Sequence, residues 1–265
     1  MKIGFIGAGN MGGAIIGGII GNRIVEPVDI IVTDVYKTKV NEISEKYNIK
    51  QGLSNEIVAA AADMLFLCVK PNVLYSVIDE IKDAVKPDTI VVSIVAGQAI
   101  AKLEEAFGRD NLKLVRVMPN TPSLVGEGMA AIVPNANADE DDTEKVLEIF
   151  NSFGKAEVVA EQLMDAVTAV SGSSPAYVFM FIEAMADAAV QGGMPRQQAY
   201  TFAAQAVLGS AKMVLETGRH PGELKDMVCS PAGTTIDAVA VLEEEGMRAA
   251  VMKAMKACID KSKSL

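Results

Sequence analysis

The sequence predicts an α/β fold in which a doubly wound, mainly parallel sheet is followed by an all-α C-terminal domain. Up to about residue 160, short apolar runs alternate with segments whose apolar residues recur at spacings of three and four. This alternation is typical of parallel strands wrapped by helices. After residue 161 the strand-like runs stop and alanine-rich helical segments follow. We therefore expect one domain at 1–160 and a second, helical domain at 161–265.

Five apolar runs in the first domain have the length and composition of buried parallel strands. They are Ile3–Ile6, Ile30–Thr33, Met64–Val69, Ile90–Val95 and Leu114–Met118. Helices between them are predicted to begin after Gly9, Lys37, Ser54, Pro71 and Ala99. Two further runs, Met129–Val133 and Glu157–Val159, are predicted to be edge strands. A helix between these two begins at Asp139 or Asp141 and ends at Gly154.

The second domain is expected to contain three or four helices with few polar faces. In the helix predicted at 175–191, Glu183, Asp187 and Gln191 fall four apart and form one narrow polar stripe. Such a helix must be buried on nearly all sides. Apolar helices of this kind are easier to bury in an interlocked dimer than in a lone monomer. We therefore expect a dimerisation domain.

Composition and charge favour a protein that acts on small molecules. The net charge is -10 at pH 7, and the sequence has no Lys- and Arg-rich cluster that would bind nucleic acid. Its three scattered cysteines form neither a disulfide framework nor a CxxC motif, which suits a reducing compartment. Repeated glycines interrupt the apolar N-terminus, so it is unlike a secretory leader, and the apolar run at 176–190 is too short to span a bilayer. We expect a cytoplasmic protein without a membrane segment.

A glycine-rich motif follows the first predicted strand. Gly7, Gly9 and Gly12 have GxGxxG spacing between a strand and a helix, which is the context of a Rossmann-type dinucleotide-binding domain. The first glycine permits a tight turn, the second lets the backbone approach a pyrophosphate, and the third allows close packing of helix on strand. Amides at the positive end of the helix would hold the pyrophosphate. The predicted cofactor-binding residues of this loop are Gly7, Ala8, Gly9, Asn10, Met11 and Gly12.

An acidic residue, Asp34, follows the second predicted strand, near where a carboxylate can bind the adenosine ribose hydroxyls. Taken alone, it favours NAD over NADP. Lys37 and Lys39 lie just downstream, however, and either could meet a 2′-phosphate if the loop turns Asp34 away. Asp34 could also simply cap the helix that follows. NADP(H) and NAD(H) therefore both stay open as cofactors.

Three more segments lie where strands of the predicted sheet end, which is where ligands bind in doubly wound folds. One follows the strand that begins at Met64, one follows the strand that begins at Ile90, and one continues from Met118. The residues of these segments predicted to bind cofactor are Val69, Lys70, Pro71, Ala96, Gly97 and Asn120. Lys70 could equally be an ordinary surface lysine.

Few residues are available for acid–base chemistry. Many dehydrogenases use His, Lys or Tyr to handle an oxygen of the substrate. The single histidine, His220, is expected to be a loop or helix-cap residue. None of the five tyrosines has a lysine four residues later, which excludes the Tyr and Lys pair of short-chain dehydrogenases. The sequence also has no metal-binding motif. A nicotinamide enzyme without such a group is chemically reasonable for an imine substrate, because a protonated iminium is already electrophilic and its nitrogen keeps the proton.

The segment Asp226–Ile236 offers a candidate holder for a substrate carboxylate. It presents hydroxyls and free amides where a helix begins, which is a typical anion-binding arrangement. The predicted substrate-binding residues are Ser230, Gly233, Thr234 and Thr235, and Thr235 is also the predicted catalytic residue. An ordinary Ser/Thr helix cap is the alternative interpretation.

With these motifs the sequence resembles the pyrroline-5-carboxylate reductase family over the whole chain. The resemblance rests on GFIGAGNMG near the start, VKP at 69–71, VMPNTP at 117–122, SGSSPAY at 171–177 and DMVCSPAGTTIDAV at 226–239. It implies reduction of the cyclic imine 1-pyrroline-5-carboxylate to L-proline by NADPH or NADH, the last step of proline biosynthesis.

The resemblance also implies how the second domain is used. Ser230, Gly233, Thr234 and Thr235 would hold the substrate carboxylate from the partner subunit, and the chain would form homodimers, often assembled into decamers. Ala232 departs from the family pattern, because a glycine is common there and a methyl group would crowd the loop. Asp34 leaves the family's usual NADP preference open.

Two other functions fit part of the pattern. A β-hydroxyacid dehydrogenase has a similar glycine motif and a helical second domain, but it should carry a catalytic lysine early in the long helix. No lysine lies between Ser171 and Gln191. A redox-sensing or scaffold protein could also bind a dinucleotide without turnover, and an assay of pyrroline-5-carboxylate-dependent NAD(P)H oxidation distinguishes it from the enzyme.

Overall fold

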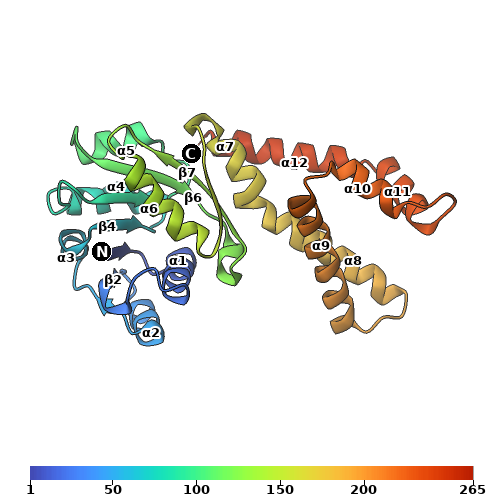
Figure 1. The fold of residues 1–265 in the computed structure, drawn as a ribbon, viewed down its shortest axis with the longest axis horizontal. Helices are drawn as coiled ribbons and strands as arrows, with labels where there is room; N and C mark the ends of the chain where they lie inside the picture. Colours follow the sequence, from blue (N-terminus) through green and yellow to red (C-terminus); the bar gives the residue numbers. More distant parts are fainter. Residues whose placement is uncertain (265) are drawn as a thin grey trace. The chain divides into compact units, whose positions relative to one another are not determined.

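The computed structural model describes residues 1–264 and divides the chain into two compact units (Figure 1). The first unit comprises Met1–Ser173 and the C-terminal residues from Cys258 onward. The second unit is Ser174–Ala257. The first contains the sheet and the second is helical, so the predicted fold class is confirmed.

The sheet of the first unit has eight strands within residues 1–264, in the order β3-β2-β1-β4-β5-β6-β7-β8. All neighbouring strands are parallel except the antiparallel pair β6 and β7, so the sheet is mainly parallel as predicted. Their bounds are β1 Ile3–Ile6, β2 Ile30–Thr33, β3 Lys50–Gln51, β4 Met64–Leu67, β5 Ile90–Ser93, β6 Lys113–Met118, β7 Gly128–Pro134 and β8 Gly154–Val158.

Helices cover both faces of this sheet, which makes it doubly wound. The long helices of the first unit are α1 Asn10–Gly21, α2 Lys37–Tyr47, α3 Asn55–Ala61, α4 Pro71–Ile81, α5 Ile100–Phe107 and α6 Glu140–Asn151. Apolar residues of α1, α2 and α6 pack with one face of the strands, and those of α3, α4 and α5 pack with the other. Short helical segments complete the unit: η1 Pro27–Asp29, η2 Thr121–Val125, η3 Glu161–Leu163, α7 Met164–Val167 and the π-helix η4 Thr168–Ser173.

The strands are continuous apolar runs because both of their faces are buried. In β1, Phe5 belongs to one layer of the core and Ile6 to the other, and both side chains are buried. Phe5 stacks on Phe66 of β4 with ring centroids 4.8 Å apart, and Phe66 lies 6.3 Å from Phe150 of α6. These contacts fix β1 and β4 side by side, together with the loops that follow them.

One predicted helix end is wrong. Gly154 does not end α6, which stops at Asn151; it begins strand β8 instead. A β-carbon at Gly154 would collide with the backbone of Gly128, so the glycine serves the close approach of β7 and β8. The predicted start of this helix is confirmed: Asp139 caps α6 in a capping box with Asp142.

The second unit contains more helices than the three or four that were predicted. Five fall wholly or partly within it, as counted over the described residues: α8 Ser174–Gln191, α9 Arg196–Thr217, α10 Pro221–Val228, α11 Thr234–Glu244 and α12 Met247–Ser262. The additional helices are short or lie close to glycine and proline breaks, which blur a helical pattern. Within residues 1–264, no helix is both long and apolar enough to cross a membrane.

The predicted burial of α8 is not reached within a single chain. Among its residues in the described part of the molecule, only Ala186 is buried. Phe179 and Met180 are 62% and 68% exposed, and Phe202 of α9 is 66% exposed. The apolar composition predicts a surface that must be buried, and a single chain does not bury it.

Candidate functional site

Ligands in a doubly wound sheet bind outside the carboxyl ends of the strands, at the point where the strand order reverses. Here that point lies between β1 and β4, which are parallel neighbours with Ile6 opposite Leu67. The Cys68 amide donates to the Ile6 carbonyl at 2.8 Å, so the loops after the two strands start side by side. The structure thus brings together the predicted segments Gly7–Gly12 and Val69–Pro71.

The glycine loop after β1 has the backbone that a dinucleotide site requires. Gly7 has a φ of 108°, and a β-carbon there would collide with the Cys68 carbonyl. A β-carbon at Gly12 would collide with the Gly7 carbonyl, whereas one at Gly9 would meet open space among the described residues. Gly9 is the N-cap of α1, and a glycine has no side chain to bond the first amides of the helix. Those amides can therefore bind an anion, and the loop fits a pyrophosphate.

Cys68 was not predicted to contribute to this site, although its position directly after a buried strand was a usable signal. Its carbonyl and side chain form the wall against which Gly7 and Gly12 pack. The residue is partly buried, and burial raises the pKa of the Cys68 thiol. Because the thiolate is the reactive form of cysteine, this direction disfavours a nucleophilic role for Cys68, and its contribution here is to form a wall of the loop.

Asp34 joins the end of β2 to the glycine loop. Its Oδ2 accepts a hydrogen bond from the Ala8 amide at 2.7 Å, and its Oδ1 accepts one from the Tyr36 amide at 2.8 Å. The alternative that Asp34 caps α2 is wrong, because Tyr36 is the N-cap residue. Lys37 is the first residue of α2, and the Lys39 Nζ lies 5.3 Å from the centre of the Tyr36 ring.

The segments after β4 and β5 lie at the same edge of the sheet as the glycine loop. Lys70 is the exposed N-cap of α4, Pro71 is its first residue, and Val69 is partly buried. After β5, Ala96 and Gly97 are partly buried, and the φ of 74° at Gly97 turns the chain toward α5. Because the strands are parallel, their carboxyl ends share this edge, as the predicted cofactor site requires.

Asn120 follows β6 and is buried. Its Oδ1 accepts from the Met129 amide at 2.8 Å, and its Nδ2 donates to the Ser171 carbonyl at 3.1 Å. The side chain thereby connects β7 to the π-helix η4. Its amide is engaged within the protein, so Asn120 can shape the cofactor site chiefly through the backbone of its loop.

The predicted carboxylate-binding loop lies in the second unit. The Gly233 amide donates to the Ser230 carbonyl at 3.0 Å, which closes a turn just before α11. Gly233 is the N-cap of α11, so Thr234 and Thr235 are its first two residues and neither occupies the cap position. This geometry leaves the hydroxyls and the first amides of the helix for an anion.

His220 has the structural role predicted for it. It is the N-cap of α10, and its Nδ1 accepts a hydrogen bond from the Gly222 amide at 3.1 Å. Because this nitrogen accepts a hydrogen bond from the first turn of α10, His220 caps the helix.

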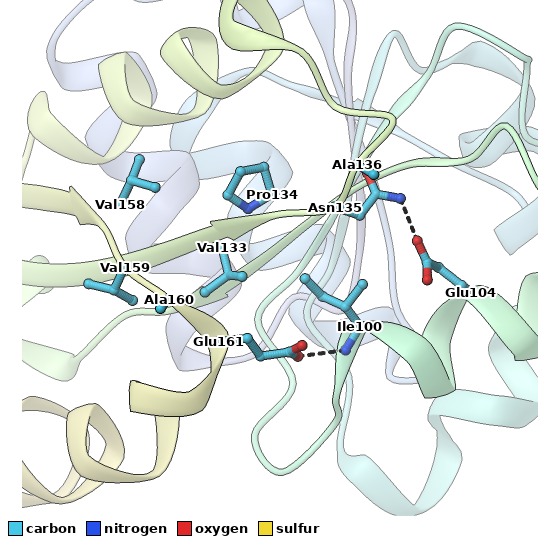
Figure 2. Close-up of a pocket in the computed structure, with 10 residues that line it drawn as sticks. All are labelled: Ile100, Glu104, Val133, Pro134, Asn135, Ala136, Val158, Val159, Ala160 and Glu161. Atoms are coloured by element: carbon cyan, nitrogen blue, oxygen red, sulfur yellow. Dashed lines mark hydrogen bonds between the residues drawn. The ribbon is translucent and has the colours of Figure 1, made fainter.

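A groove of about 530 Å³ lies elsewhere on the first unit, between α5 and the ends of β7 and β8 (Figure 2). Its carboxylates already have structural partners. Glu161 accepts from the Ile100 amide at 2.7 Å and from Arg116 at 2.9 Å, and Glu104 accepts from Asn135 at 2.8 Å. Within the described part of the chain, none of the predicted site residues lines this groove. It is therefore distinct from the dinucleotide site.

Comparison with known proteins identifies the relatives of the chain. Residues 161–265 match the family model described as pyrroline-5-carboxylate reductase dimerisation, and residues 2–97 match one described as NADP oxidoreductase coenzyme F420-dependent. Pyrroline-5-carboxylate reductase of Escherichia coli is 57% identical over 264 residues, which are 100% of this chain and 98% of the relative. The chain belongs to the pyrroline-5-carboxylate reductase family. The predicted family and the predicted class of nicotinamide-dependent oxidoreductase are both confirmed.

Solved structures of the pyrroline-5-carboxylate reductase family have the same fold. The Plasmodium falciparum pyrroline carboxylate reductase, described with NADP bound, superposes with a TM-score of 0.91 at 36% identity and covers 100% of this chain and 97% of its own. The 3-hydroxyisobutyrate dehydrogenase of Mycobacterium tuberculosis reaches a TM-score of 0.53 at 16% identity over 72% of this chain and 66% of its own. The second likeness shows a related fold alone, so the hydroxyacid dehydrogenase alternative gains no support from it.

Proposed function

We propose that this chain reduces 1-pyrroline-5-carboxylate to L-proline, with NADPH or NADH as the hydride donor. The observation that carries the proposal is the 57% identity to the Escherichia coli reductase over the full chain. Both predicted binding loops lie within the matched length. A dinucleotide-binding protein without turnover remains an outcome of the test below.

The dinucleotide would be held by the loops at the carboxyl edge of the sheet. Gly9 offers open space for the pyrophosphate, and the first amides of α1 face it. When bound, the nicotinamide supplies a hydride to the substrate. The proposed cofactor-binding residues are Gly7, Ala8, Gly9, Asn10, Met11, Gly12, Asp34, Val69, Lys70, Pro71, Ala96, Gly97 and Asn120.

The loop before α11 would hold the substrate carboxylate, with Ser230, Gly233, Thr234 and Thr235 as its partners. The Ser230 and Thr235 hydroxyls and the amides at the positive end of α11 are suited to an anion. A carboxylate held there fixes the ring, and Thr235 acts catalytically by orienting the imine carbon. The substrate reacts as the iminium ion, whose nitrogen already carries a proton and keeps it while the carbon gains the hydride. The chain therefore needs no side chain to donate a proton to the nitrogen during hydride transfer.

The second unit would dimerise through its exposed apolar helices, in agreement with the dimerisation model that matches residues 161–265. We extend this to a shared active site, in which the carboxylate loop serves the partner subunit, and to assembly of dimers into decamers. We also propose a cytoplasmic location, since three unpaired cysteines suit a reducing compartment.

The direct test is turnover by the purified chain. Pyrroline-5-carboxylate is added to protein and reduced cofactor, cofactor oxidation is followed by absorbance, and proline is identified by mass spectrometry. We expect proline equal to the cofactor oxidised. Binding of cofactor without substrate-dependent oxidation would refute the reductase and favour the non-catalytic alternative.

A further inference from the structure

The carboxylate of Asp34 is fixed in place by the backbone around it. Two consecutive residues of the glycine loop bond to the end of β2: the Gly7 amide donates to the Thr33 carbonyl at 2.8 Å, and the Ala8 amide donates to Asp34 Oδ2 at 2.7 Å. The Tyr36 amide holds the other carboxylate oxygen at 2.8 Å. Turning this half-buried side chain away would break two charge-assisted hydrogen bonds. Asp34 therefore stays beside the glycine loop.

A carboxylate fixed in this way can only accept hydrogen bonds. Each of its oxygens has about two lone-pair directions, and the structure uses one on each. The remaining positions suit a hydroxyl, which donates a proton. A phosphate monoester is mostly dianionic near neutral pH, so it would face Asp34 as a second acceptor with like charge. A ribose 2′-hydroxyl placed at this carboxylate would therefore be favoured over a 2′-phosphate.

The two lysines nearby do not reverse this preference. Lys37 and Lys39 are both exposed, and the Lys39 ammonium lies over the Tyr36 ring at 5.3 Å. Flexible, exposed ammonium groups act through water and contribute little at any fixed point. The Asp34 carboxylate, by contrast, is held at one position by two backbone donors.

We propose that Asp34 determines the cofactor specificity of this chain and that it selects NADH over NADPH. The inference rests on the proposed function for its role in the reductase reaction. The selection between NADH and NADPH can itself be measured as a difference in binding affinity without substrate. It departs from the Plasmodium falciparum relative, whose structure has NADP bound. Asp34 is at the same time a positioning residue for the Ala8 amide.

The test measures binding without substrate, by calorimetric titration of NADH and of NADPH into the protein. For the wild-type chain we expect NADH to bind about tenfold more tightly or better. Asp34→Ser removes the carboxylate and should lower the ratio of the two affinities at least tenfold, with NADPH binding more tightly than before. Asp34→Asn keeps the size and one acceptor oxygen, so it should shift the ratio in the same direction with less disturbance of the loop.

Glu42→Gln is the matched control, because Glu42 is an exposed acid of α2 and its loss changes the net charge equally. It should leave the ratio unchanged, and thermal unfolding of all variants shows whether they are folded. Tighter binding of NADPH by the wild type would overturn the proposal, as would an unchanged ratio in both Asp34 variants. If pyrroline-5-carboxylate is reduced with NADPH but not with NADH, the result would support the reductase function and overturn the selection of NADH. Absence of turnover would refute the reductase and leave the binding ratio to decide the role of Asp34.

Discussion

Thr235 is the residue on which the proposed carboxylate site depends most. It is the second residue of α11, it is partly buried, and Gly233 occupies the cap position before it. Thr235→Ala should therefore reduce kcat/KM on the order of a hundredfold, because the imine loses a contact that orients it. The melting temperature should change little. Steady-state kinetics and thermal unfolding of the same protein measure both effects.

The control for Thr235 is Thr143→Ala in the first turn of α6. The Thr143 hydroxyl donates to the Asp139 carbonyl at 2.8 Å, so this substitution also removes a threonine hydroxyl near a helix start. Its kcat/KM should stay at the wild-type value. Near-normal kinetics for Thr235→Ala together with a lowered melting temperature would make Thr235 a structural residue and place the carboxylate site elsewhere.

Ala232 adopts a backbone conformation that favours glycine. Its φ of 55° lies in the left-handed region, which costs a residue with a β-carbon roughly 1 kcal/mol or more. Ala232→Gly should raise the free energy of unfolding by at most about 1 kcal/mol, because glycine also loses more chain entropy on folding. The melting temperature should rise by at most about 2–4 °C. The strain explains why a glycine suits this loop.

Ala254→Gly provides the opposite case, since Ala254 lies inside α12. The same chemical change there should lower stability by roughly 0.5–1 kcal/mol. If both substitutions destabilise the protein equally in chemical unfolding, the left-handed strain at Ala232 is not the deciding effect.

Two glycines of the glycine loop should respond differently to substitution, one mainly in dinucleotide affinity and the other also in stability. Gly9 has a φ of -72° that alanine adopts readily, and its β-carbon would point into open space among residues 1–264. Gly9→Ala should weaken dinucleotide binding at least tenfold while stability falls by only about 0.5–1 kcal/mol, the difference between glycine and alanine at an N-cap. Gly12→Ala drives a β-carbon into the Gly7 carbonyl and should destabilise the first unit as well. Calorimetric titration and thermal unfolding compare the two variants, and equal losses of stability would contradict this assignment.

The start of α6 carries a pH-dependent contribution to stability. Burial alone would raise the pKa of Asp142, but the Lys113 ammonium at 2.7 Å and the Asp139 amide outweigh it, so the pKa lies below its ordinary value of 3.8. A folded-state pKa that is depressed stabilises the protein above the unfolded value and stops doing so as the pH falls through the folded value. Asp142→Asn should therefore cost about 1–3 kcal/mol at pH 7, and progressively less as the pH falls below 3.8 toward the folded-state value.

Urea unfolding at pH 7 and at pH 3 measures this difference for Asp142. Asp141→Asn is the control, because Asp141 is exposed in the same turn and should change stability little. An equal loss for Asp142→Asn at pH 7 and at pH 3 would show that shape, and not charge, matters at this position.

The elements that the sequence predicted well are those in which composition and burial agree. Strands β1 and β2 have the predicted bounds because every residue of β1 is buried and apolar, and β2 is nearly so. Strand β3 was missed because it consists of Lys50 and Gln51 alone, both exposed, and shows no apolar pattern. Gly154 was misassigned because its purpose is a contact with Gly128, which no local pattern contains.

In the candidate site, too, some features could be predicted from the sequence and others could not. The glycine spacing located the loop after β1, and the position of Asp34 after β2 was also predicted. That Asp34 bonds the Ala8 amide could not be predicted, since the two residues are 26 apart and meet only through the pairing of β1 with β2. The contribution of Cys68 was missed because the strand predicted at Met64–Val69 included it, whereas β4 ends at Leu67. Contacts between these loops depend on which strands are neighbours in the sheet. The sequence indicates that order only indirectly, through the GxGxxG motif that is typical of a Rossmann-type domain.

The exposed apolar helices of the second unit imply that the folded chain is not a monomer. Phe179 of α8 and Phe202 of α9 are each more than half exposed, and residues 161–265 match a dimerisation model. Large exposed apolar patches are unfavourable in water, so a partner should cover these side chains. Sedimentation should show no folded monomer of the wild type at micromolar concentration. Phe179→Asp would place a charge in the covered surface and should weaken the dimer by several kcal/mol.

Leu53→Asp is the control for this last substitution, because Leu53 is 91% exposed but lies in the first unit. It changes an exposed apolar residue to the same acid and should leave the dimer intact. Because the proposed carboxylate loop serves the partner subunit, activity should fall together with the dimer fraction as Phe179→Asp is diluted. A stable, active monomer of that variant would refute the shared site. An inactive monomer that still binds dinucleotide would support the proposal, because each first unit would then hold a complete cofactor site while the catalytic site would need two chains.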